Sequence, residues 1–222
     1  MSLTELIVAI GISSIVLAMV FAVVGSFARN DARNLVRQAR VEEVRQVGLW
    51  LGDALAYAES EPLSGSAGSE PVFEEATAQK MVFTSDLGGG TSANQRALSR
   101  VTVALGVTCD GAADPGVLRR CVQHPFDDAY GVPQFCPTMA SCGAGLFEDK
   151  VMARDVAPQT LFTYFLEGAT GVGQGVPEVI DPAQRARISA VEFTVTVSGP
   201  ESGTTTESTV YKRYTVNEWR RW

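Results

Sequence analysis

The sequence contains few of the side chains from which active sites are usually built. Its single histidine, His124, adjoins Pro125 and is expected to lie in a loop or at the surface rather than to act as a base. The glycine run 88–90 lacks the lysine and the serine or threonine of a phosphate-binding loop and is predicted to be a turn. Because no catalytic constellation is present, we expect that the chain is not an enzyme and needs no cofactor.

The cysteines lack the C-x-x-C spacing of a zinc site. They are Cys109, Cys121, Cys136 and Cys142, separated by 11, 14 and 5 residues. An even number of cysteines predicts disulfide bonds, and these form in an oxidising compartment outside the cytoplasm.

The regular ligand spacing of a calcium loop is also missing. Four aspartates carry oxygen atoms of the kind that calcium binds: Asp110, Asp114, Asp127 and Asp128. Without that spacing they are predicted to be solvated turn residues, and no metal site is expected.

An excess of positive charge, which nucleic-acid binding requires, is absent. The net charge is −7, which argues against a phosphate-binding surface. The C-terminal segment 219–222 combines arginines with tryptophans, but we expect it to pack its aromatic rings on the protein. No nucleic-acid partner is therefore expected.

Charge is missing altogether from Leu6 to Ala28, a run of 23 residues. As a helix this run is about 35 Å long, enough to cross a bilayer core of about 30 Å. A signal peptide would have a basic segment in front of a shorter apolar run, whereas no lysine or arginine precedes Arg29. The run therefore predicts a transmembrane helix.

Positive charge follows the apolar run instead of preceding it. A simple anchored protein with this arrangement would hold the basic flank, and with it the rest of the chain, in the cytoplasm. The cysteines indicate the opposite side. The two signals agree if a basic leader once preceded Met1 and was removed.

The segment Met1-Ser2-Leu3-Thr4-Glu5-Leu6-Ile7-Val8-Ala9-Ile10 resembles the mature N-terminus of type IV pilins and type II secretion pseudopilins. That pattern is an aromatic or methionine residue, a small hydroxyl residue, Leu, any residue, and then Glu before an unbroken apolar run. The resemblance implies cleavage by a prepilin peptidase and N-terminal methylation at Met1. It also implies a single pass through the bacterial inner membrane with the head in the periplasm, followed by assembly into an extracellular or periplasmic filament. The implied partners are other pilins or minor pilins and the inner-membrane assembly platform.

Glu5 falls where this family keeps its single buried acid. We hypothesise that it pairs with the N-terminal amine of an adjacent subunit and so sets axial register, since an unpaired charge in hydrocarbon costs several kcal/mol. Ser2 and Glu5 also fit a capping box, which would need no partner subunit. Major pilins often carry a proline near position 22, where this chain has Ala22, and this difference favours a minor pilin or a pseudopilin.

The helix is expected to continue to about Ala58. Apolar residues recur at spacings of three and four, forming one stripe: Val44, Val47, Leu51, Ala54, Leu55 and Ala58. The segment 49–58 resembles the L-x-x-D-L-x-x-A ending of PilW-type minor pilins and J-type pseudopilins.

Short alternating segments after residue 59 predict antiparallel strands. They are 80–84, 101–107, 117–122, 161–166, 191–197 and 209–216. The predicted fold is therefore α+β, with a membrane segment 1–28, an amphipathic helix half 29–58 and a β head 59–222.

The hairpin predicted around the turn 110–120 also suggests a disulfide pairing. Four cysteines allow three connectivities. Cys109 and Cys121 flank this turn, which favours a Cys109–Cys121 bond and a second bond between Cys136 and Cys142. We expect a disulfide-stapled insertion at about 109–142.

The function expected from this resemblance is that of a structural subunit of a type IV pilus-like filament. A PilW-like minor pilin that primes assembly or sits near the tip fits best. The alternatives are a J-type pseudopilin of a type II secretion pseudopilus and, in a different class, a membrane-anchored extracytoplasmic binding protein or enzyme.

Overall fold

The structure is a computed structural model that describes residues 3–59, 71–87, 98–127, 133–136, 146–167, 175–197 and 208–215. Contacts along the chain divide it into two compact units, Met1–Val41 and Glu42–Trp222. The boundaries expected at residues 28 and 58 were drawn from charge and periodicity, and they stay predictions.

One long helix, α1, runs from Leu3 to Ala56. It passes through Gly11, Ala22 and Gly25 without a break. A glycine in a helix costs about 1 kcal/mol relative to alanine, against about 3 kcal/mol for proline, so the unbroken helix is what the sequence predicts.

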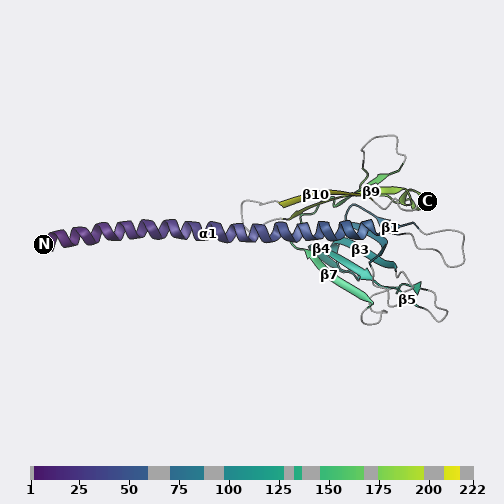
Figure 1. Ribbon diagram of the computed structural model, residues 1–222, viewed down its shortest axis with the longest axis horizontal. Coiled ribbons are helices and arrows are strands. Elements are labelled where there is room, and N and C mark those ends of the chain that lie inside the picture. The colour runs from purple at the N-terminus through teal and green to yellow at the C-terminus, as the bar shows by residue number, and fades with distance from the viewer. Residues whose placement is uncertain are drawn as a thin grey trace. The chain divides into compact units, whose positions relative to one another are not determined.

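The last four turns of α1 form the centre of the second unit. All six residues of the predicted stripe are buried, each with at most 4% of its surface exposed. They belong to one apolar cluster with side chains from both larger sheets, including Phe73, Phe83 and Phe193. In the view of Figure 1, β9 and β10 lie on one side of these turns and β3, β4 and β7 on the other. The periodicity therefore identified the face of the helix around which the head is built.

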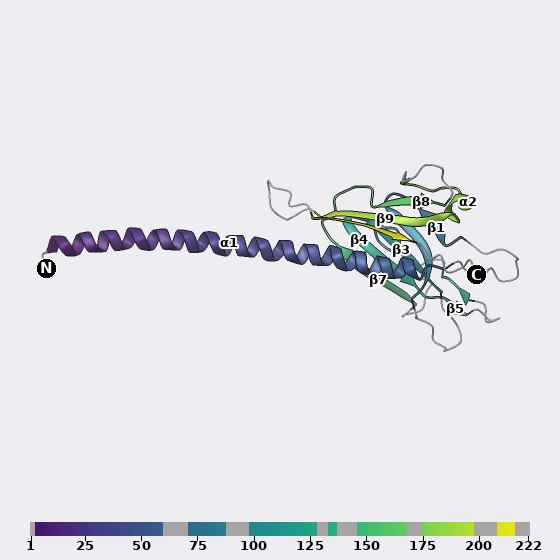
Figure 2. The same ribbon diagram turned by 45° about the horizontal axis from the view of Figure 1, so that its top comes forward.

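The larger sheet has five antiparallel strands in the order β1-β2-β3-β4-β7. Its strands are β1 (Phe73–Ala76), β2 (Lys80–Asp86), β3 (Leu98–Val107), β4 (Ala113–Gln123) and β7 (Phe147–Ala153). Figure 2 shows β3, β4 and β7 beside the same turns of α1. In β3 the residues Val101, Val103 and Leu105 are buried, as their alternation predicts.

A second antiparallel sheet has the order β10-β9-β8. Its strands are β8 (Phe162–Leu166), β9 (Ile188–Val197) and β10 (Ser208–Thr215). A small pair, β5 (Phe126–Asp127) with β6 (Pro133–Gln134), and a one-turn helix α2 (Pro182–Arg185) complete the described elements. The α+β class and the antiparallel pairing are confirmed, but the sequence did not indicate that the strands divide between two main sheets.

The turn between β1 and β2 joins the two sheets. The carbonyl of Ala78 accepts hydrogen bonds from the amides of Leu161 (2.8 Å) and Phe162 (3.1 Å), where β8 begins. The hydroxyl of Tyr164 on β8 donates to the carbonyl of Thr77 (2.9 Å). These bonds satisfy polar groups that would otherwise be buried without a partner.

The helix ends two residues earlier than predicted because the chain then pairs with β2. Ala58 forms a β-bridge with Ser85. The buried hydroxyl of Ser85 donates to the carbonyl of Ala54 (2.7 Å), one of the last four carbonyls of α1, which have no partner within the helix. The end of the helix is thus fixed to the edge of the core.

The insertion expected at about 109–142 is in part sheet. β4 lies inside this range and is an internal strand, paired with β3 on one side and β7 on the other. A bulge between Leu105 and Gly106 shifts the register, and Gly106 supplies the positive φ of 79° at this point. Between Gln123, where β4 ends, and Phe147, where β7 begins, the described residues lie outside the larger sheet.

We predict that Leu51→Ala lowers the free energy of unfolding of the full chain by about 2–5 kcal/mol, because it leaves a cavity in a fully buried site. Leu49→Ala is the matched control, since Leu49 lies on the same helix with 48% of its surface exposed. It should cost less than about 1 kcal/mol. Urea unfolding in detergent, followed by near-UV circular dichroism, measures both, and equal losses would contradict the burial of this face.

Candidate functional site

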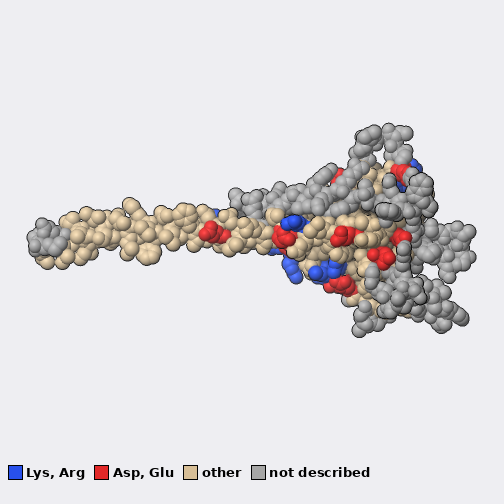
Figure 3. All heavy atoms as spheres, in the orientation of Figure 1, with Lys and Arg blue, Asp and Glu red and all other residues tan. Residues whose placement is uncertain are grey.

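The uncharged half of α1 is the most unusual surface among the described residues. The stretch is long and apolar enough to cross a membrane, and none of its most apolar window is buried within the protein. Large side chains along it stay uncovered, for example Ile10 (61% exposed) and Phe21 (67% exposed). Figure 3 shows this part of the helix as uncharged surface in the view drawn. A monomeric soluble protein rarely exposes an apolar patch larger than a few hundred Å², and an exposed surface of this kind is typical of membrane or protein contact sites.

The predicted assembly residues lie at the start of this helix. Glu5 belongs to the first turns of α1, but its side chain is outside the part of the structure that is described, as are Met1 and Ser2. The capping box and the pairing across subunits both stay predictions.

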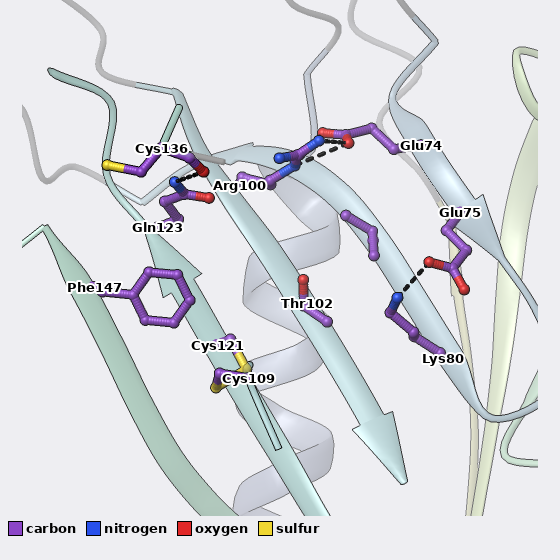
Figure 4. A pocket seen from close by; sticks show the side chains of 11 residues that line it. Glu74, Glu75, Lys80, Arg100, Thr102, Cys109, Cys121, Gln123, Cys136 and Phe147 are labelled. Carbon is purple, nitrogen blue, oxygen red and sulfur yellow. Dashed lines mark hydrogen bonds and ion pairs between the residues drawn. A yellow bond between two sulfur atoms is a disulfide. The ribbon is translucent and has the colours of Figure 1, made fainter. Parts of the chain in front are cut away.

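A second candidate site is a shallow groove of about 350 Å³ on the larger sheet. Figure 4 shows its side chains on the face of the sheet that is turned away from α1. One row of it crosses the sheet in register from Glu75 to Val82, Thr102 and Cys121. Along β2 and β3 these positions alternate with core residues such as Phe83 and Val101, so the period of two that builds the core also builds the groove, although Val82 and Cys121 are themselves buried.

The charges that line this groove neutralise one another. Arg100 donates from Nε to both carboxylate oxygens of Glu74 (2.7 and 2.9 Å). The Lys80 ammonium lies 2.6 Å from Glu75. The described lining thus offers a ligand no uncompensated charge, and the groove carries no assignment of chemistry.

A disulfide bond joins Cys109 and Cys121 at one end of the groove. This is the first of the two expected bonds, although the two residues are not opposite one another in the hairpin. Cys121 faces Thr102 in the register, and Cys109 reaches it from the turn after β3. Cys136 is also disulfide-bonded. Cys142 lies outside the described residues, so the pairing of Cys136 with Cys142 stays a prediction.

The same two cysteines form, with Asp149, the one group of three possible metal ligands found in the described part of the chain. Their sulfur atoms are in the disulfide and therefore are not thiolate ligands. Asp149 accepts hydrogen bonds from Arg119 (3.0 and 3.1 Å). This group is better suited to fixing the sheet than to binding a metal.

Two of the four aspartates considered as calcium ligands have other partners in the structure. Asp110 accepts a hydrogen bond from the Thr108 hydroxyl, which lowers the pKa of its carboxyl group. Asp114 accepts from Nε of Arg119 (2.8 Å), and its carboxylate, followed by that of Asp149, raises the pKa of the guanidinium. Asp127 lies in β5, and Asp128 is outside the described residues.

His124 lies after β4, half-buried and outside any strand, as a loop residue should. Its Nδ1 is 2.9 Å from the Ser99 hydroxyl, a separation typical of a nucleophile and its base. Ser99 has no exposed surface, however. A substrate cannot reach a hydroxyl in that position, so this hydrogen bond serves to hold the segment after β4 against β3.

One contact between α1 and the larger sheet was not foreseen. The Arg120 guanidinium stacks over the Trp50 ring, 4.5 Å from its centroid, and is hydrogen-bonded to Glu148. Arg120 occupies an inward position of β4 that alternation assigns to an apolar residue. The sequence signal that could have indicated this contact is Trp50 on the amphipathic half of the helix, because the face of a tryptophan ring can cover a cation.

No known protein-family model matches the sequence, and no curated protein does. The assignment to a family therefore rests on the residues at the N-terminus and stays a proposal.

Tyr164 provides a test of the core through pH. Burial, followed by the nearby charge of Glu75, raises the pKa of its phenol well above the ordinary value of about 10. The unfolded chain loses this proton near pH 10 while the folded chain keeps it, so the associated stability is present below pH 10 and is lost as pH rises further.

We predict that Tyr164→Phe costs about 1 kcal/mol at neutral pH, because the hydrogen bond to Thr77 is lost. Above about pH 10 this difference should shrink by up to about 1.4 kcal/mol for each pH unit. The matched control is Tyr57→Phe at an exposed tyrosine. Urea unfolding at several pH values measures both, and a constant difference for Tyr164→Phe would disprove the assignment.

Proposed function

We propose that the chain is a structural subunit of a type IV pilus-like filament. The observation that carries the proposal is the difference in burial between the two halves of α1. Side chains of the uncharged run Leu6–Ala28 are exposed, whereas the stripe from Val44 to Leu55 is buried in the head. A helix built in this way has one half for a hydrophobic environment outside the protein and one half for its own domain.

The exposed half would serve in two environments in turn. In the membrane it would contact lipid, and in a filament it would contact the same half of neighbouring subunits. Lipid tails are as apolar as leucine side chains, so exchanging one contact for the other gives little driving force. The preference for the filament must then come from packing and from polar groups.

Glu5 is the polar group proposed for this role. It is the one acid within the first 28 residues. A lone carboxylate in an apolar environment is costly, and pairing it with the N-terminal amine of the next subunit removes that cost only at one axial position. The pair would therefore select register as well as assembly.

Within the family we favour a PilW-like minor pilin that primes assembly or sits near the tip. The unbroken helix through Ala22 supports this choice, because the proline frequent in major subunits is absent. A J-type pseudopilin of a type II secretion pseudopilus is the alternative with the same helix.

Mass spectrometry of the N-terminus of the protein from its native membrane tests the proposal. We expect the mature chain to begin at Met1 with one added methyl group on its amine. An N-terminus that is neither cleaved nor methylated would sink the proposal and favour a membrane-anchored extracytoplasmic binding protein or enzyme.

We predict that Glu5→Gln reduces incorporation into sheared filaments about tenfold or more, which corresponds to about 1.4 kcal/mol of lost pairing. Glu42→Gln is the matched control, because it removes one exposed acid from the same helix. Immunoblots of membrane and filament fractions measure the ratio for each. If Glu5→Gln is incorporated as efficiently as the wild type, the pairing role of Glu5 is wrong and only the capping role is left.

A further inference from the structure

The segment of α1 that follows the uncharged run carries a face rich in arginine. Its members, which we call the arginine stripe, are Arg29, Arg33, Arg37 and Arg40. Successive spacings of four, four and three residues place these positions within about 80° around the helix. Asp31, the one acid in this segment, falls on the opposite side. The charges are thus sorted by face.

The structure shows how the first of these side chains is directed. Arg29 donates from Nε to the carbonyl of Gly25 (3.0 Å), one turn back along the helix. Its guanidinium therefore lies over the last turn of the uncharged run. Long side chains on helices generally lean towards the N-terminus, and the same direction is expected for Arg33, which is exposed.

Distances along the helix place the stripe at the depth of lipid headgroups. The headgroup layer is about 5–8 Å thick on each side of a bilayer. Arg33 lies about 6 Å beyond Arg29, so both fall within this layer if the uncharged run spans the hydrocarbon core. Arg40 lies about 16 Å beyond Arg29 along the helix. If its side chain leans towards the N-terminus, the distance from its charge to the headgroups comes close to the screening length at physiological salt.

We propose that Arg29 and Arg33 bind the phosphate groups of anionic phospholipids, with Arg37 and Arg40 strengthening the attraction. This inference rests on the membrane location in the proposed function. Guanidinium groups bind phosphate oxygens in pairs of hydrogen bonds, and each basic residue near the surface favours an anionic membrane roughly fivefold. The stripe thereby fixes the depth of the helix and holds an unassembled subunit among anionic lipids, whichever side of the membrane the stripe faces.

The test uses the full chain, labelled with ¹³C at arginine Cζ and reconstituted in vesicles. Half of the samples contain phosphatidylcholine alone, and half contain added phosphatidylglycerol. Solid-state NMR measures the arginine signal that lipid ³¹P dephases. We expect dephasing with phosphatidylglycerol, much less without it, and loss of most of the dephasing in the Arg29→Gln/Arg33→Gln variant, which removes the two arginines proposed to contact phosphate.

Arg45→Gln is the matched control, since Arg45 lies off the stripe beside Glu42, at 3.6 Å. It should leave the dephasing unchanged. Equal dephasing in both lipid mixtures, or an unchanged signal in the double variant, would overturn the inference. Contact of the labelled arginines with aspartate carboxylates of a second, differently labelled copy would assign the stripe to helix association instead.

Alkaline extraction of the same vesicles tests the membrane location of the chain separately from the lipid-binding role of the arginine stripe. Wild type and both variants should stay in the membrane fraction, because the uncharged run is intact in each. If the chain is extracted, the membrane location itself is wrong. If it stays and no phosphorus contact appears, only the lipid-binding role of the stripe is wrong.

Discussion

Burial of one helix stripe is the constraint on which the rest of the head depends. The larger side chains of this stripe, such as Leu51 and Leu55, each gain about 1.5–3 kcal/mol by leaving water. The inner faces of both larger sheets meet the same stripe, so neither sheet has a complete core without it. The aromatic contact Phe73–Tyr164 then links the two sheets, and Phe162 contacts Phe193 on the neighbouring strand of the second sheet.

The polar groups of the head are arranged to keep that stripe in place. The hydroxyl of Ser85 binds a carbonyl at the end of α1, and the amide of Asp86 donates to the carbonyl of Tyr57 (3.0 Å). On the other face of the larger sheet, opposite charges pair between strands, Lys80 with Glu75 on the neighbouring strand and Arg100 with Glu74 across β2. The apolar side chains of the sheet therefore pack against the helix, and its outer face forms a groove in which the charged side chains are paired with one another.

Sequence reasoning succeeded where periodicity is long or regular. The C-terminal half of α1 and the strands β3 and β9 each bury one face, and this burial gives a regular spacing of apolar residues in the sequence. β7 was missed because it is an edge strand with the charged run Glu148-Asp149-Lys150, whose side chains are all exposed. β1 has four residues and an irregular register, too short for a pattern. The division into two sheets depends on backbone bonds such as those to Ala78, which no side chain encodes.

The assembly site is harder to read than the fold because it is completed by other molecules. An apolar helix surface fits lipid and neighbouring helices about equally well, so its composition cannot distinguish a lone anchor from a filament subunit. Discrimination has to come from groups whose free energy differs between the two environments. In the proposed function these are the acid near one end of the uncharged run and the arginines that follow the other end. A carboxylate is costly in hydrocarbon until a cation meets it, whereas a guanidinium at the headgroup level is already satisfied by phosphate. The two ends would thus act in opposite senses, with Glu5 favouring departure from the lipid and the arginine stripe opposing it until a neighbouring subunit is present.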